Sequence, residues 1–100
     1  VTGIGLVTPV GIGNEATWQA VCSGRSGVNR ITKFDPTEHK TQIAAEINGF
    51  DPELYMNAKE ARKTDTFIQY AVTAAKFALE DSGLEITEEL SPRMGTIIGS

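Results

Sequence analysis

The most regular pattern of apolar and polar positions in the chain lies between Asp65 and Gly83. Apolar residues recur there every three or four positions, which predicts a helix that Asp65 caps, that runs to about Ser82 and that Gly83 ends. The apolar stripe consists of Phe67, Ile68, Ala71, Val72, Ala75, Ala78 and Leu79. The alanines allow a neighbouring backbone to approach closely, as in a helix buried between layers.

Two β-rich apolar runs, residues 1–7 and 94–99, predict buried strands near the two ends of the chain. The chain opens on Val1 without an initiator Met, already inside the first run. Natural domains usually end in exposed polar linkers and not beside buried strands. We therefore expect residues 1–100 to be an incomplete part of a larger domain, cut at both ends.

A short helix is expected soon after the first strand. Asn14 is a good N-cap residue, so the helix is predicted to cover Glu15–Ser23, with Gly24 as its terminator. Its apolar face comprises Trp18, Val21 and Cys22.

The middle of the chain has weaker signals. Residues 28–31 and 42–47 are short strand candidates. A short helix is expected to start at Asp51-Pro52, because Pro favours the first helical position, and a second to cover residues 58–63. The alternation of strands and helices predicts an α/β fold with a mostly parallel sheet and covering helices.

Composition narrows the function classes. The formal net charge of −4 argues against nucleic acid as a partner, since such proteins carry a basic footprint. No apolar run approaches the roughly 18–20 residues that span a bilayer, so no membrane association is expected. No secretory leader is visible. One cysteine excludes an intramolecular disulfide and fits a reducing compartment.

A glycine-rich segment, Gly11–Ala16, fits the G-x-G-x-x-A form of the dinucleotide fingerprint. That fingerprint needs a tight turn from strand to helix, whereas Thr8-Pro9-Val10 separates the predicted strand from Gly11. A glycine-rich connection is therefore favoured, and dinucleotide binding is the minor alternative.

Candidate nucleophiles and metal ligands are few. Cys22 lies near the end of its predicted helix, where the helix dipole disfavours a thiolate, so we expect a buried packing cysteine. His39 lies in a polar loop and is expected at the surface. One Cys and one His cannot build a metal site. The acidic run of residues 85–89 is interpreted as a solvated loop without chemistry.

Lys59, Arg62 and Lys63 are spaced i, i+3, i+4, so on a helix all three project from one face. Such a cluster is either a solvated helix surface or a docking patch for an acidic or phosphorylated partner. The residues alone favour the solvated surface.

Several of these segments together resemble one family, the β-ketoacyl-acyl carrier protein synthases, and among them the elongating type II enzymes. The resemblance covers the whole chain in order and spacing, with one small departure at Thr64-Asp65, where the family often has Met-Asp. The residues that carry it are Val1-Thr2-Gly3-Ile4-Gly5-Leu6-Val7-Thr8-Pro9-Val10-Gly11, Trp18, Gly24, Ser26-Gly27-Val28, Phe34-Asp35, residues 59–71 (KEARKTDTFIQYA), residues 78–84 (ALEDSGL) and Ile97-Ile98-Gly99-Ser100.

The resemblance implies a thiolase-like fold, layered α/β/α/β/α with mixed, mostly parallel sheets, of which residues 1–100 form an incomplete N-terminal half. It implies a homodimeric acyltransferase of fatty acid elongation that condenses an acyl thioester with malonyl-acyl carrier protein, losing carbon dioxide. The family's Cys-His-His set lies downstream of Ser100, so no catalytic residue, cofactor or metal is expected within residues 1–100, and the chain alone is expected to be inactive.

The resemblance also changes the interpretation of the basic residues. Lys59, Arg62 and Lys63 match the synthase residues that meet the acidic, phosphopantetheinylated acyl carrier protein. A bacterial cytoplasmic enzyme is implied, and the missing initiator Met leaves an organellar origin open. A non-catalytic chain-length-factor-like subunit of a polyketide synthase stays the main alternative. The acyl-chain preference is not encoded in these residues, because the family's acyl-pocket loop begins beyond them.

Overall fold

The computed structural model describes residues 1–99, and Ser100 lies outside the described residues. The chain forms two compact units, one of residues 1–5 with residues 51–99 and the other of residues 6–50.

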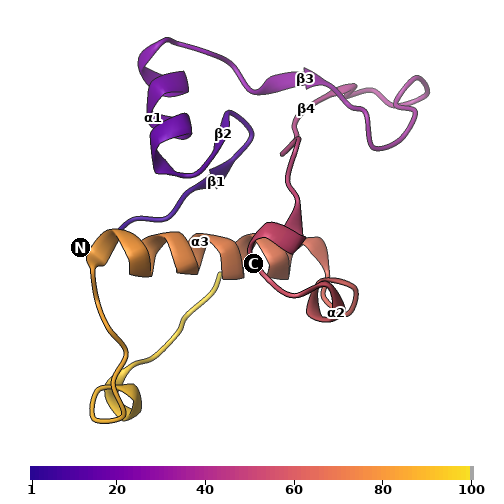
Figure 1. Cartoon of the computed structure of the whole chain (residues 1–100). Coiled ribbons are helices and arrows are strands. Elements are labelled where there is room, and N and C mark those ends of the chain that lie inside the picture. The colour runs from indigo at the N-terminus through magenta and orange to yellow at the C-terminus, as the bar shows by residue number, and fades with distance from the viewer. Residues whose placement is uncertain (100) are drawn as a thin grey trace. The chain divides into compact units, whose positions relative to one another are not determined.

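The first unit is built on one long helix (Figure 1). As predicted from the apolar stripe, α3 covers Thr66–Ser82, with Asp65 as its N-cap residue and Gly83 as a left-handed C-cap residue at φ 64°. The Asp65 side chain makes no capping hydrogen bond. The predicted cap positions are therefore confirmed, although the Asp65 carboxylate takes no part in capping the helix.

Three short helical turns belong to the same unit as α3. The 3₁₀ turn η1 covers Pro52–Leu54, and the Asp51 carboxylate accepts a hydrogen bond from the Glu53 N–H at 3.0 Å, as expected for an Asp-Pro helix start. The helix α2 covers Ala58–Ala61, two residues shorter than predicted. The 3₁₀ turn η2 covers Ser91–Arg93.

The backbone of Val1–Gly5 lies directly on α3. A Cβ atom added at Gly3 would lie 2.7 Å from the Cβ of Ser82 and closer still to the Ala78 carbonyl oxygen. A Cβ atom at Gly5 would lie 2.6 Å from the Ala78 nitrogen and closer still to the Ala74 carbonyl oxygen. These contacts follow positions 74, 78 and 82, which is one face of the helix. The alanines thus admit a neighbouring backbone, as the sequence predicts.

The two terminal strands were predicted wrongly except at Val7, which lies in a short strand. Within the described residues, neither the segment before Val7 nor residues 94–99 join a sheet, and Val1 and Ile97 are fully exposed. A strand needs a partner for its N–H and C=O groups. The Ile4 N–H finds another acceptor, the Asp81 carboxylate of α3, at 2.9 Å.

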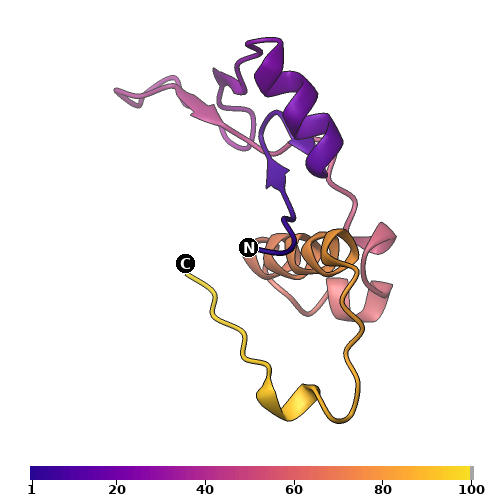
Figure 2. The ribbon, with the colours of Figure 1, turned by 90° about the vertical axis from the view of Figure 1, so that its left-hand side faces the viewer.

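The second unit begins with a hairpin that turns into a helix (Figure 2). Strands β1 (Val7–Thr8) and β2 (Gly11–Ile12) pair antiparallel, and α1 covers Asn14–Cys22. Helix α1 starts one residue earlier than predicted, because Gly13, not Asn14, is its N-cap residue. Gly24 has φ 69° just beyond the helix, which agrees with its predicted role as terminator.

The apolar face predicted for α1 is not the face that packs. Trp18 and Val21 are 65% and 56% exposed, and Cys22 is exposed, so the prediction of a buried packing cysteine is wrong. The buried residues of α1 are Thr17 and Ala20. The Thr17 hydroxyl donates to the Gly11 carbonyl at 3.1 Å, which turns this face toward the hairpin.

The predicted middle strands are confirmed in shorter form. Strands β3 (Val28–Arg30) and β4 (Ile43–Ala45) pair antiparallel, with Val28 opposite Ala45 and Arg30 opposite Ile43. Both sheet pairings within residues 1–99 are therefore antiparallel, so the parallel strand pairs expected from the alternation do not occur in the described part of the chain.

Side chains hold the loop between β3 and β4 together. The Arg30 guanidinium donates to Gln42 Oε1 at 2.6 Å and to the Thr37 hydroxyl at 3.1 Å. The Thr37 hydroxyl and N–H donate to Asp35, and this pair lowers the pKa of Asp35 below its ordinary 3.8, with the hydroxyl as the larger cause. Likewise the Thr32 hydroxyl is the main cause that lowers the pKa of Glu46 below 4.5.

We expect Gly5→Ala to destabilise the protein by about 3 kcal/mol, the upper end for overpacking, because the new methyl group meets α3 backbone atoms that cannot rotate away. Denaturant unfolding measures the change. Gly95→Ala is the matched control, since a Cβ atom there meets nothing within 4 Å. Equal stabilities of the two variants would contradict the close approach.

The loop between β3 and β4 should loosen in acid. A carboxylate with a lowered pKa in the folded state stabilises that state above the ordinary pKa, and this contribution is lost as the pH falls through the lowered value. Carboxyl chemical shifts should therefore show Asp35 titrating below 3.8. Thr37→Val should move its pKa back up, whereas Thr41→Val should leave it unchanged; a titration of Asp35 that is the same in both variants would argue against the Thr37 hydrogen bond.

Candidate functional site

The three predicted docking residues, Lys59, Arg62 and Lys63, are called the basic face from here on. Lys59 lies in α2, and Arg62 is the C-cap residue with helical φ −72° and ψ −18°. The Arg62 N–H donates to the Ala58 carbonyl at 3.2 Å, and the Lys63 N–H donates to the Glu60 carbonyl at 3.0 Å. The helical path thus continues past the last residue of α2, and the i, i+3, i+4 spacing keeps the three side chains on one side.

The charges of the basic face are open to a partner. All three residues are exposed, and within residues 1–99 their side chains make no hydrogen bond or ion pair. Cations near a helix C-terminus are also favoured by the helix dipole, so the arrangement costs the fold little. This surface can attract an acidic group of a binding partner. Exposed charges act mainly on the rate at which the partner is encountered and on the orientation in which it binds.

Helix α2 is far too short to be stable alone, so contacts must hold the basic face in place. At its start, the Asn57 side chain accepts from the Glu60 N–H at 2.8 Å. In the middle, Ala61 is only 9% exposed. The sequence Asn57-Ala58-Lys59-Glu60 resembles a capping box and is a signal that sequence reasoning could have used for this helix start.

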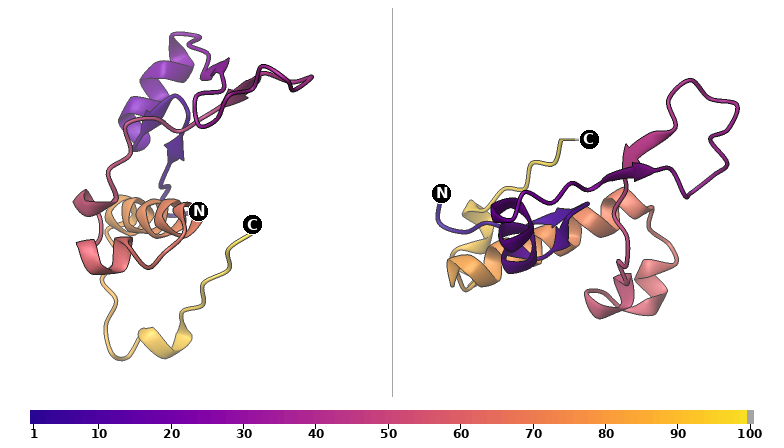
Figure 3. Two further views of the ribbon diagram at one scale, coloured as in Figure 1. Left: turned by 90° about the vertical axis from the view of Figure 1, so that its right-hand side faces the viewer. Right: turned by 90° about the horizontal axis from the view of Figure 1, so that it is seen from above.

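At the end of α2, side chains donate hydrogen bonds to backbone carbonyls. In a longer helix, the N–H groups of the next turn would donate to these carbonyls. The Thr64 hydroxyl donates to the Glu60 carbonyl at 2.9 Å. The Gln69 amide, from the first turn of α3, donates to the Ala61 carbonyl at 2.8 Å and to the Thr64 carbonyl at 3.2 Å. Figure 3 shows α2 beside the helix that carries Gln69. Thr64 and Gln69 were not predicted as site residues, because no local pattern reveals a contact between two helices.

The glycine-rich segment is not arranged as a dinucleotide site. Gly11 is itself in β2, and the Gly11 N–H already donates to the Thr8 hydroxyl at 3.1 Å. The Gly13 N–H donates to the Leu6 carbonyl at 2.8 Å. These N–H groups are two that a pyrophosphate would need, so the hairpin uses them for its own structure.

Cys22 and His39 form no pair. Cys22 is exposed near the end of α1, and within residues 1–99 no hydrogen bond joins it to His39. His39 is exposed, as predicted, and its ring packs edge-on against Phe34 with centroids 5.3 Å apart. No cluster of three or more metal-ligating side chains is found among the described residues.

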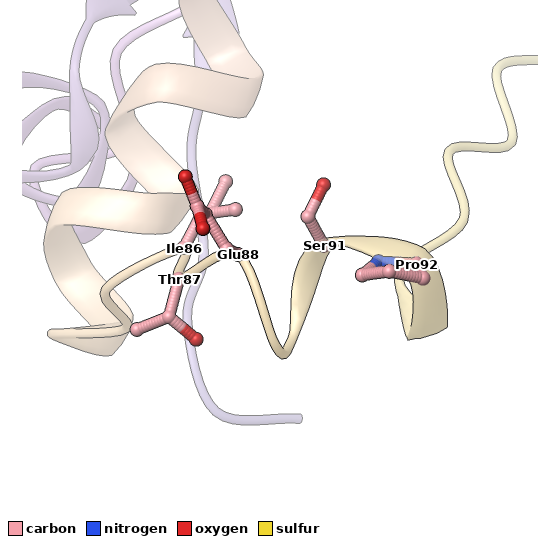
Figure 4. Close-up of a pocket in the computed structure, with 5 residues that line it drawn as sticks. All are labelled: Ile86, Thr87, Glu88, Ser91 and Pro92. Carbon is pink, nitrogen blue, oxygen red and sulfur yellow. The ribbon is translucent and has the colours of Figure 1, made fainter.

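A shallow hollow of about 380 Å³ lies beside the acidic run (Figure 4). The residues that line it are Ile86, Thr87, Glu88, Ser91 and Pro92. Glu88 is its one carboxylate, and every lining residue is exposed, so the hollow offers no desolvated acid or base. Nothing in it contradicts the interpretation of a solvated acidic loop.

Comparison with known proteins places the chain in a family. The family model described as "Beta-ketoacyl synthase, N-terminal domain" matches residues 1–100. Proteins named 3-oxoacyl-(acyl-carrier-protein) synthase 2 are similar over the whole chain, with 51% identity in Coxiella burnetii and 50% in Vibrio cholerae. The relative with that name in Staphylococcus aureus is 37% identical over the whole chain, which is 25% of its length.

A solved structure supports the same assignment. The structure described as "The ishigamide ketosynthase/chain length factor" superposes with a TM-score of 0.75 at 33% identity, covering 85% of this chain and 21% of that one. The fold is therefore that of a ketosynthase, which confirms the thiolase-like α/β fold class. The chain belongs to the β-ketoacyl synthase family, in its N-terminal domain. It spans about a quarter of the length of the curated relatives it matches.

Among residues 1–99, no helix combines the length and the apolar character that crossing a membrane requires.

Proposed function

We propose that the chain is the N-terminal part of a 3-oxoacyl-acyl carrier protein synthase that elongates fatty acids in the bacterial cytoplasm, as a homodimer. The observation that carries this proposal is the 51% and 50% identity, over all of the chain, to relatives with that name. Residues 1–100 then form an incomplete half of the synthase domain, because they correspond to about a quarter of those relatives.

In this proposal the chemistry belongs to residues outside the chain. A cysteine thiolate accepts the acyl group from its carrier thioester, malonyl-carrier protein loses carbon dioxide, and the resulting carbanion attacks the acyl-enzyme carbonyl and releases the thiolate. The thiolate is the nucleophile, and two imidazoles stabilise the developing oxyanion. We assign none of these roles to residues 1–100. Cys22 is no candidate for the nucleophile, because within residues 1–99 no hydrogen bond pairs its thiol with a base.

The contribution of residues 1–100 is delivery of the substrate. The basic face is exposed and makes no ion pair within the described residues, so its charge is available to an acidic carrier protein. A cluster of positive charge raises the rate of encounter and fixes the orientation in which the carrier docks. Because Lys59, Arg62 and Lys63 lie on one helical side, they can act on the same carrier surface together.

A non-catalytic chain-length-factor-like subunit is the second candidate, because the solved structure that superposes on this chain is named for a chain length factor as well as a ketosynthase. The 33% identity to that structure is lower than the identity to the named synthases, which favours the catalytic interpretation. Mass spectrometry of the full-length protein after incubation with acyl-carrier protein separates the two, since only the synthase forms an acyl-enzyme.

The full-length protein with Lys59→Glu, Arg62→Glu and Lys63→Glu should bind acyl carrier protein about 10- to 100-fold more weakly at low salt, because attraction becomes repulsion. Titration calorimetry across a salt series checks this, and the salt dependence should flatten or reverse.

The matched control carries the same change in net charge on three other exposed residues, Arg25→Glu, Lys40→Glu and Arg93→Glu. It should keep most of the affinity. If both triple variants lose affinity equally, net charge and not the basic face governs docking.

The 100-residue chain alone should show neither condensation nor malonyl decarboxylation above background, since the proposed thiol and imidazoles lie outside it. Release of labelled carbon dioxide from malonyl-carrier protein is the measurement. In the full-length enzyme, Cys22→Ala should leave the condensation rate unchanged. A loss of activity in that variant would show that Cys22 has a role we have not assigned.

A further inference from the structure

We propose that Gln69, with Thr64, positions the basic face for the carrier protein; this inference rests on the proposed function. Neither residue belongs to the basic face, and neither has a charge with which to attract a partner. Their role is to hold Arg62 and Lys63 in the one arrangement that docking uses. The side chains of Gln69 and Thr64 are together called the clamp.

The geometry of the Gln69 amide supports this role. Its two hydrogens are donated to the carbonyls of Ala61 and Thr64, which are the residues immediately before Arg62 and immediately after Lys63. One side chain thus closes both ends of the two-residue segment that carries most of the positive charge. A primary amide has two donors on one nitrogen, and here both are used.

The backbone of Gln69 is held in place by hydrogen bonds within α3 and to its N-cap residue. Its backbone N–H donates to the Asp65 carbonyl at 3.1 Å, and its carbonyl accepts from the Thr73 hydroxyl at 2.8 Å. Thr73 is fully buried, with 0% of its surface exposed. A continuous set of hydrogen bonds therefore leads from the interior of the first unit, through Gln69, to the basic face.

Thr64 completes the clamp from the other side. Its hydroxyl donates to the Glu60 carbonyl at 2.9 Å, so the last carbonyls of α2 receive hydrogen bonds from side chains although the helix stops. Among other side chains, Met at position 69 fills similar volume but has no donor, and Glu offers only acceptors to two carbonyl acceptors. Either change would remove the Gln69 donor from the Ala61 and Thr64 carbonyls.

The consequence for docking is preorganisation. Long cationic side chains on a loose backbone must be ordered when the partner binds, which weakens the observed affinity. A clamped backbone removes part of that cost. The clamp should therefore act on the KM for carrier-borne substrate and leave the chemical step unchanged.

The test uses the full-length enzyme with malonyl-acyl carrier protein and, separately, with a malonyl-pantetheine thioester that has no protein part. Gln69→Met should raise the KM for the carrier substrate about three- to tenfold, the effect of one or two lost hydrogen bonds, with kcat unchanged. The kcat/KM for the small thioester should not change. The salt dependence of carrier binding should become shallower.

Gln42→Met is the matched control. The Gln42 amide also donates to two backbone carbonyls, those of Thr37 at 3.1 Å and His39 at 3.4 Å, but in the other compact unit. It should leave the KM for the carrier substrate unchanged. If Gln69→Met folds poorly, two milder substitutions at Thr64 test the clamp. Thr64→Val should raise the KM for the carrier substrate, whereas Thr64→Ser, which keeps the hydroxyl, should have the KM of the unsubstituted enzyme.

Four results would overturn the inference: an unchanged carrier KM in Gln69→Met, an equal rise in Gln42→Met, an equal loss with the small thioester, or identical KM values for Thr64→Val and Thr64→Ser. The triple reversal of the basic face distinguishes this failure from that of the proposed function. If the reversal raises the carrier KM and Gln69→Met does not, the clamp fails and the docking function stands. If neither variant raises it, the docking function fails as well.

Discussion

The first unit depends on the contact of the Val1–Gly5 backbone with α3. Glycine at positions 3 and 5 lets this segment lie against the helix backbone at Ala74 and Ala78, where any side chain would overlap carbonyl oxygens. The Ile4 N–H fixes the same segment to the Asp81 carboxylate. Such close packing leaves α3 little freedom to rotate, because the helix presents backbone and not flexible side chains to its neighbour.

A helix fixed in this way can serve as a platform for the short elements around it. The Tyr55 ring packs edge-on against Phe77, with centroids 5.3 Å apart, and the Lys76 ammonium group donates to the Tyr55 carbonyl. Gln69 holds the end of α2 in the same manner. None of the short helical turns would persist alone. Their positions, and with them the position of the basic face, therefore follow from α3.

The parts of the fold that could be predicted are those with local causes. Helix α3 was predicted with both caps, because its apolar stripe, Asp65 and Gly83 all lie within one stretch of sequence. The runs at 1–7 and 94–99 have equally strong β character, but a strand exists only with a partner, and no local pattern states whether one is present. For α1, periodicity identified an apolar face, yet the hydrogen bond of Thr17 to the hairpin selected a different face for packing.

In the candidate site, too, the features with local causes could be predicted and those set by contacts between elements could not. Spacing alone placed Lys59, Arg62 and Lys63 on one side of a helix, and the structure continues the helical path far enough to keep them there. Their stability in that position depends on Gln69, which is separated from them by a helix boundary and resembles any other polar residue of an exposed helical surface.

Position matters more than charge for such a surface. Individual exposed ion pairs contribute little free energy, because water and salt screen them. Three charges contribute usefully to recognition only when they meet a partner surface together, and this requires a backbone that does not have to be ordered first. In α2 the helix itself is too short to supply that order. The side chains that donate to the carbonyls at the end of α2 therefore have a second effect. They also restrict the positions in which the three charged residues meet a partner.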